Sequence, residues 1–198
     1  MFKRLFKRKS AAPIVVVSGL PRSGTSMMMK MLEAGGIPPL QDGERTADGD
    51  NPRGYYEFER VKQLDKGDTA WLPDAVGKVV KVISALLVHL PEGYQYKVLF
   101  MRRDIDEVLA SQSKMLVNRD EEKGVSDDDM KVLYRKHLKQ VFSWTARQEH
   151  VSVLDLDYRE LVTDPLAQIP KINAFLGGGL DVKAMASVVE PTLYRNRS

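Results

Sequence analysis

The chain has 198 residues, 43% of them apolar and 29% charged, which fits one ordinary globular domain with a buried core. It has no cysteine and only three scattered histidines, which excludes a disulfide scaffold, a thiol nucleophile and an iron–sulfur cluster, and we expect no metal site. Five basic residues lie within residues 3–9, and the rest of the chain holds 25 basic and 27 acidic residues. Because the body is slightly acidic, we expect it not to bind nucleic acid.

Residues 1–12 are predicted to form a flexible basic tail, and residues 13–198 a single domain. Phe2, Leu5 and Phe6 recur at helical spacing among the basic residues. The tail therefore has two interpretations, a solvated segment or a weak membrane-surface contact through residues 1–9. No apolar run approaches the ~18 residues of a membrane span, and the run at 11–19 is too short for a secretion signal. We expect a cytoplasmic protein.

From residue 13 onward, apolar strands alternate with helices. The β-branched run at 13–18 lacks alternation, as in a strand buried on both faces, and strands are also predicted at 78–83, 96–101 and 150–157. Helices are predicted at 25–35, 58–66, 104–118, 127–149, 158–164, 165–176 and 181–189. This pattern predicts a single-domain, three-layer α/β fold, with helices on both faces of a parallel sheet and the ligand at the carboxyl ends of its strands.

A glycine-rich turn joins the first strand to the first helix. Residues 19–26, GLPRSGTS, have the spacing of a phosphate-binding P-loop, whose backbone N–H groups form an anion nest at a helix N-terminus. Thr25 stands where nucleoside triphosphatases have the lysine that neutralises β- and γ-phosphates, and the nearest cation is Arg22. Triphosphate chemistry is therefore poorly supported, although Asp155, on the last predicted strand, could imitate a magnesium-binding acid.

Three segments resemble the sulfotransferases that use 3′-phosphoadenosine 5′-phosphosulfate (PAPS). PRSGTS at 21–26 resembles their 5′-phosphosulfate loop, in the arginine variant of the protein-tyrosine sulfotransferases and bacterial relatives. KVLFMRRDIDEVLAS at 97–111 resembles their 3′-phosphate motif, strand–RDxxDVLxS, and DLDYRELVTDP at 155–165 resembles their strand–YEDLxxDP segment. The resemblance spans residues ~14–165 and implies a P-loop-kinase-like sheet topology.

The resemblance also implies roles for particular residues. The 5′ end of PAPS would lie on Arg22, Ser23, Gly24, Thr25 and Ser26, its 3′-phosphate on Arg103 and Ser111, and its adenine against Tyr158. Tyr158 has a second interpretation, a core ring at a strand-to-helix corner. The whole interpretation requires the Arg103 guanidinium to face the glycine turn and not to be buried against an unrelated carboxylate. No metal is required in this scheme.

The resemblance does not assign the general base to a single residue. The histidine that cytosolic members use would fall at Ile83, so that role does not transfer, and His89 could replace it only if residues 84–90 folded over the site. The tyrosine sulfotransferases use a glutamate in the loop after the P-loop helix. By that resemblance we rank Glu57 first, then Glu44 and Asp50, with Lys81 able to assist the sulfonate.

The sequence thus predicts a PAPS-dependent sulfotransferase that moves a sulfuryl group to a hydroxyl or amine by in-line displacement, with Arg22 stabilising the leaving group. The acceptor, a small molecule, a peptide or a glycan, cannot be read from the sequence. Loops 36–57 and 68–77 are expected to line its pocket, with Tyr55, Tyr56 and Trp71 either lining it or anchoring the loops. The alternatives are a kinase-like ATP-dependent phosphotransferase and a non-catalytic nucleotide-binding adaptor tethered to a membrane.

Overall fold

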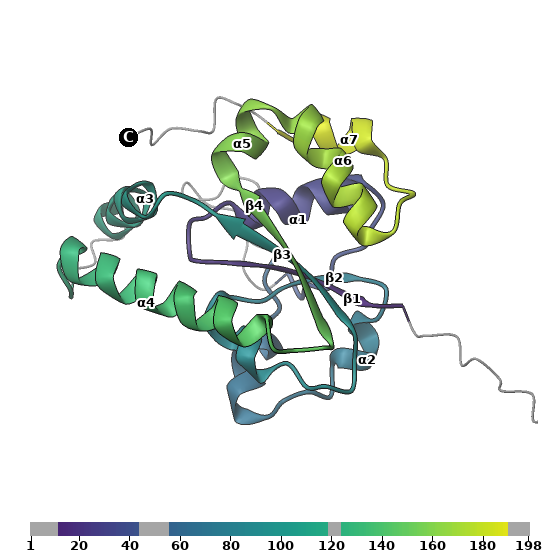
Figure 1. Cartoon of the computed structure of the whole chain (residues 1–198), viewed down its shortest axis with the longest axis horizontal. Coiled ribbons are helices and arrows are strands. Elements are labelled where there is room, and N and C mark those ends of the chain that lie inside the picture. The colour runs from purple at the N-terminus through teal and green to yellow at the C-terminus, as the bar shows by residue number, and fades with distance from the viewer. Residues whose placement is uncertain (1–11, 44–55, 119–123, 190–198) are drawn as a thin grey trace, which may run out of the picture.

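A computed structural model describes residues 12–43, 56–118 and 124–189, and structural statements here concern those residues. Its centre is a four-stranded parallel sheet with strand order β2-β1-β3-β4 (Figure 1). The strands are β1 (Ile14–Gly19), β2 (Val79–Lys81), β3 (Tyr96–Arg102) and β4 (Val151–Asp157). The predicted parallel α/β fold is confirmed.

The register of the sheet brings the ends of the predicted motifs to one edge. Gly19, where the glycine turn begins, is paired with Met101, and the next residue of β3, Arg102, is paired with Asp157 of β4. On the other side of β1, Val17 is paired with Lys81. Because all four strands run parallel, their carboxyl ends share this edge, where α/β folds bind ligands.

Helices cover both faces of the sheet (Figure 1). On one face lie α1 (Thr25–Ala34), α5 (Tyr158–Thr163), α6 (Pro165–Leu176) and α7 (Val182–Ser187). On the other face lie η1 (Glu59–Lys66), α2 (Leu72–Ala75), η2 (Ser84–His89) and α4 (Asp127–Thr145). The remaining helix, α3 (Ile105–Asn118), follows β3 and contacts α4.

Side chains of the central strand alternate between the two cores. Val15 and Val17 pack with α1, whereas Ile14 and Val16 pack on the opposite face. All four are buried, which explains why the strand reads as an unbroken apolar run. Trp71 belongs to the second core: it is 1% exposed and its indole N–H donates to the Asp68 carbonyl at 2.9 Å, so of its two interpretations the core anchor is correct.

The segment after β2 differs from the prediction. Residues 78–83 were expected to form one strand, but β2 ends at Lys81. Val82 N still donates to Val17 O at 3.0 Å, after which the chain turns at Ile83 into the 3₁₀-helix η2. β2 is the edge strand of the sheet, and the isolated bridge on its outer side involves Val79 and Pro39, so the chain can leave the sheet after Lys81 without breaking a second ladder. This early turn brings Ser84 to the sheet edge.

The other boundaries lie close to their predicted positions, although α4 ends at Thr145, four residues before the predicted end. Within the described ranges, no helix combines the length and the apolar character that crossing a bilayer requires. The predicted tail and its membrane contact at residues 1–9 lie outside the described residues.

Candidate functional site

The glycine turn between β1 and α1 adopts a closed loop conformation. A Cβ on Gly19 would lie 2.5 Å from Ser23 Oγ and 2.6 Å from Met101 O, so only glycine fits there. Ser23 is buried and its hydroxyl donates to Leu20 O at 2.7 Å, which ties the two sides of the turn together. Arg22 has φ 66°, an uncommon left-handed conformation for a residue with a side chain.

The turn leads directly into the N-terminus of α1. The N-cap is Gly24, with φ 97°, and it has no side chain with which to cap the first N–H groups. The N-terminal end of the helix dipole favours an anion at this position. Arg22 lies in the same turn, so a cationic residue stands two positions before this helix N-cap.

Hydrogen bonds join this turn to the segment that follows β3. Arg22 Nε donates to Ser111 Oγ at 3.0 Å across 89 residues of sequence. In addition, Arg103 Nη1 donates to the backbone carbonyl oxygen of Arg22 at 3.2 Å. The two candidate phosphate-binding segments are therefore parts of one cluster at the sheet edge.

The Arg103 side chain also pairs with a carboxylate. Its Nε donates to Glu107 Oε2 at 2.8 Å, and the two side chains are 8% and 4% exposed. Glu107 is the acid four residues after Arg103, at the second acidic position of the motif that residues 103–111 resemble. Arg103 therefore faces the glycine turn, as required, while a buried partner from its own motif fixes its orientation.

The ring of Tyr158 lies beneath this cluster. It is 6% exposed, the Arg103 guanidinium carbon lies 4.7 Å from its centroid, and a Cβ on Gly24 would overlap the ring. Burial raises the pKa of its hydroxyl, with Arg103 opposing the shift. These contacts are those of the core ring at a strand-to-helix corner, the second interpretation given for Tyr158.

A second cation reaches the start of α1 from β2. Lys81 Nζ lies 3.4 Å from Ser26 Oγ and 3.8 Å from Glu57 Oε1. Lys62 Nζ lies 3.8 Å from the other oxygen of the same carboxylate, Glu57 Oε2. Glu57, the first-ranked base candidate, thus lies at the sheet edge between two ammonium groups. Glu44 and Asp50 lie outside the described residues.

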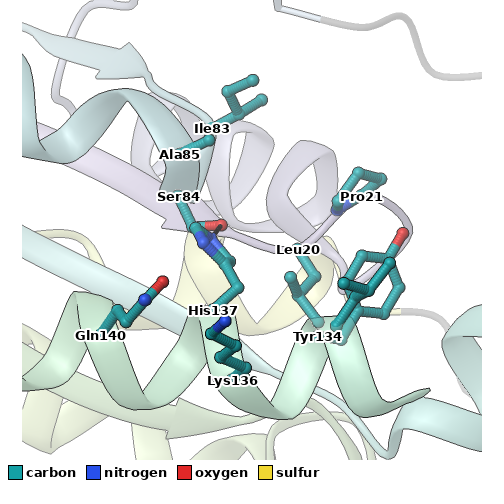
Figure 2. Close-up of a pocket in the computed structure, with 10 residues that line it drawn as sticks. Leu20, Pro21, Ile83, Ser84, Ala85, Tyr134, Lys136, His137 and Gln140 are labelled. Carbon is teal, nitrogen blue, oxygen red and sulfur yellow. Dashed lines mark hydrogen bonds between the residues drawn. The ribbon is translucent and has the colours of Figure 1, made fainter. Parts of the chain in front are cut away.

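A cavity of about 510 Å³ opens beside the glycine turn (Figure 2). Leu20 and Pro21 of the turn form one wall, Ile83 and Ser84 another, and α4 supplies Leu133 and His137. Ser84 Oγ and His137 Nε2 are 2.8 Å apart, and burial lowers the pKa of His137. His89, by contrast, is exposed at the end of η2.

Comparison with known proteins agrees with this arrangement. The family model described as "Sulfotransferase domain" matches residues 12–198. The chain belongs to the sulfotransferase family. Among curated proteins, none matches its sequence.

Solved sulfotransferases have the same fold at low sequence identity. The sulfotransferase domain of the Synechococcus PCC 7002 olefin synthase is 16% identical with a TM-score of 0.54, over 97% of this chain and 86% of that one. Sulfotransferase STF1 from Mycobacterium tuberculosis H37Rv is 16% identical with a TM-score of 0.57, over 90% and 72% of the two chains. The sulfotransferase from Alicyclobacillus acidocaldarius is 18% identical with a TM-score of 0.50, over 87% and 85%.

The structure brings most of the predicted site residues to one edge of the sheet and adds two that the sequence analysis missed. The residues brought together there are Arg22, Ser23, Gly24, Thr25, Ser26, Glu57, Arg103, Ser111 and Tyr158. The missed residues are Ser84 and His137, separated by 53 positions and joined only by the fold. Of the loops expected to line an acceptor pocket, the described parts, 36–43, 56–57 and 68–77, do not line this cavity. Asp155 instead pairs with Arg102 at 3.0 Å.

Proposed function

We propose that this sulfotransferase takes its sulfuryl group from PAPS and transfers it in line to a hydroxyl or amine. The observation that carries the proposal is the pair of hydrogen bonds that connects Arg22 with Ser111 and Arg103 with the Arg22 carbonyl. A donor with phosphates at both its 5′ and 3′ positions needs two sets of anion-binding groups within one site. The α1 N-terminus and the Arg103–Ser111 segment would provide them.

The charges of the cluster fit such a donor. Arg22, Arg103 and Lys81 place three cations around one helix N-terminus, and Glu107 is the buried carboxylate among them. In this scheme Arg22, Ser23, Gly24, Thr25 and Ser26 hold the 5′-phosphosulfate, and Arg103 and Ser111 hold the 3′-phosphate. Charge-assisted hydrogen bonds of roughly 1.5–3 kcal/mol each could hold the donor without a metal ion.

PAPS supplies an activated sulfuryl group whose phosphate leaves as the bond to sulfur breaks. The protein's task is to position the reactants and to stabilise the negative charge that develops on that phosphate. Arg22 lies at the helix N-terminus where this charge would develop. Lys81, beside Ser26, adds a second positive charge at the same place.

The proton of the acceptor needs a base, and Glu57 is the carboxylate predicted for it, ahead of Glu44 and Asp50. Its contacts give it another task as well. Because Glu57 lies 3.8 Å from Lys81 Nζ, its charge also holds that ammonium near the start of α1. Loss of Glu57 would therefore affect the transfer step more than the affinity for the donor.

Nucleotide binding separates this proposal from its alternatives. In titration calorimetry, 3′-phosphoadenosine 5′-phosphate (PAP) should bind without magnesium and far more tightly than ADP. If magnesium-ATP binds and a 3′-phosphate adds no affinity, the protein is a kinase-like phosphotransferase and PAPS is not its donor. If PAP binds but no acceptor is sulfated in a broad screen, the protein is a nucleotide-binding adaptor.

The partners and the cellular location that we propose are those that the sequence indicates. The acceptor is a small molecule or the exposed part of a peptide or glycan, nucleic acid is not a partner, and the protein acts in the cytoplasm. Any weak membrane contact would be made through residues 1–9.

A further inference from the structure

Two walls of the cavity beside the glycine turn are formed by residues that are close in sequence to residues of the proposed donor site. Pro21, in one wall, directly precedes Arg22, the cation assigned to the leaving phosphate. Ile83 and Ser84, in another wall, follow Lys81 by two and three residues, and the Lys81 ammonium lies 3.4 Å from Ser26 Oγ. A molecule in the cavity would therefore lie next to the atoms that hold the sulfuryl group.

The rim of the cavity favours a molecule that is mostly apolar. Ile83 and Leu133 expose 48% and 52% of their surface, and both line the cavity. Exposed apolar side chains around a concave site commonly mark the place where an apolar ligand binds. The volume of about 510 Å³ is within the range of small-molecule sites.

Ser84 and His137 form a hydrogen-bonded pair among these apolar walls. They come from η2 and α4, their side chains point toward one another, and Ser84 Oγ is 2.8 Å from His137 Nε2 (Figure 2). Ser84 is only 3% exposed, and His137 is half-buried beside it. A buried hydroxyl beside an imidazole can receive a proton and pass its own to the ring nitrogen.

The surroundings keep the imidazole able to accept a proton. Burial lowers the pKa of His137, which leaves the ring neutral near pH 7. On α4, the titratable groups that line the cavity with it are Lys136 and Tyr134, and burial keeps the Tyr134 phenol protonated by raising its pKa. The lining residues from η2 and from the glycine turn carry no charge.

We propose that this cavity binds the acceptor, a hydroxyl compound with an apolar body, and that Ser84 and His137 take its proton. The assignment rests on the proposed sulfuryl transfer. The acceptor oxygen forms a bond to sulfur while the bond between sulfur and the bridging phosphate oxygen breaks, its electron pair remaining on the phosphate. The hydroxyl proton moves to Ser84 Oγ as the Ser84 proton moves to His137 Nε2. In this relay Glu57 is not the base, and its task is to hold the Lys81 ammonium near the start of α1.

Kinetics on the full-length protein test this relay. With PAPS as donor and 2-naphthol, 4-nitrophenol and cyclohexanol as probe acceptors, Ser84→Ala and His137→Gln should each lower kcat by roughly 100-fold or more. The dissociation constant for PAP should stay within about twofold, because neither side chain is assigned to the donor. The acid limb of the kcat/KM profile should be lost in His137→Gln, and His89→Gln, at an exposed histidine, should behave as wild type.

Binding to the cavity has its own readout. With ¹³C-labelled histidine and bound PAP, 2-naphthol should shift the His137 imidazole resonance, which His137→Gln identifies by its disappearance, and leave the His89 resonance unchanged. No shift, or no transfer to any of the three probes, would overturn the acceptor site. Undiminished kcat in a folded Ser84→Ala or His137→Gln protein would overturn the relay. Failure of the wild-type protein to bind PAP would instead overturn the proposed donor. Absence of transfer would then follow from the wrong donor, and the shift with 2-naphthol, repeated without PAP, would still test the acceptor site.

Discussion

Arg22 donates a 3.0 Å hydrogen bond from its Nε to the hydroxyl of Ser111, although 89 residues separate them in the chain. The bond joins the loop that begins α1 to a helix that follows β3. Since both segments begin at the carboxyl ends of neighbouring strands, β1 and β3, the sheet itself brings them together. The proposed donor would lie across this contact, with one phosphate group on each side.

Ser111→Ala should therefore weaken the binding of PAP more than that of ADP. A hydrogen bond to a charged group contributes roughly 1.5–3 kcal/mol, so we expect a loss of at least about tenfold for PAP. Titration calorimetry with both nucleotides measures the difference. Ser113→Ala is the matched control, because the Ser113 hydroxyl donates to Leu109 O within the same helix. An equal loss for PAP and ADP would contradict the assignment of Ser111 to the 3′-phosphate.

Arg103→Ala should lower PAP affinity by about 2 kcal/mol or more, roughly 30-fold, and leave ADP affinity nearly unchanged. It should also reduce the free energy of unfolding, because the buried Glu107 carboxylate would lose its 2.8 Å ion pair with Arg103, a loss of about 3–5 kcal/mol for a pair of this kind.

The double variant Arg103→Met/Glu107→Leu separates these two effects. It removes both charges, so it should unfold at a urea concentration close to that of the wild type while PAP binding stays weak. Recovery of PAP affinity in the double variant would show that Arg103 does not contact the 3′-phosphate.

Glu57→Gln should lower kcat by about tenfold or more and change donor affinity by less than about threefold, since the carboxylate is paired with Lys81 and Lys62. Steady-state kinetics with 2-naphthol measure kcat, and calorimetry with PAP measures the donor affinity. Glu59→Gln is the control, because Glu59 also pairs with Lys62 but is exposed. If Glu57→Gln, and not His137→Gln, abolished the acid limb of the pH profile, the carboxylate would be the base.

Gly24→Ala should destabilise the protein and abolish nucleotide binding. The residue has φ 97°, and a Cβ would overlap the Tyr158 ring, so the loop or the ring must move. Thermal melting with and without PAP measures both losses. Gly93→Ala, where a Cβ meets no atom within 4 Å, should leave both unchanged. A Gly24→Ala protein that bound PAP normally would mean that the loop does not hold the 5′-phosphate in this conformation.

The stability of the protein should depend on His137 in mildly acidic solution. Burial lowers the pKa of this imidazole below its ordinary 6.5, so the unfolded chain binds the proton more readily than the folded one. The free energy of unfolding should therefore fall between pH 7.5 and 5.5, and the fall should be smaller in His137→Gln. Urea unfolding at the two pH values measures this fall. If the free energy of unfolding fell equally in the wild type and in His137→Gln, the lowered pKa of the imidazole would be refuted.

Local patterns in the sequence were enough to predict the sheet and the glycine turn. An unbroken apolar run, a glycine turn and an amphipathic helix each span fewer than about 15 residues, and their order determines a parallel topology. Arg22, Gly24, Arg103 and Ser111 were identified because each belongs to such a short pattern.

The Ser84–His137 pair of the proposed acceptor site was not predictable in this way. Ser84 and His137 meet because β2 ends early and η2 turns toward α4, and neither event leaves a recurring spacing in the sequence. Tyr158 shows a related limit. Its position in the chain is equally compatible with an adenine-stacking surface and with a core ring, and its contacts with Gly24 and Arg103 become visible only in the fold.

The aromatic ring beneath Gly24 also has a consequence for how fast a nucleotide is captured. A loop supported from below by a rigid side chain keeps its shape before the ligand arrives, so little conformational entropy remains to be lost on association. Capture should then proceed at the rate of diffusive encounter, and the lifetime of the complex would determine its strength.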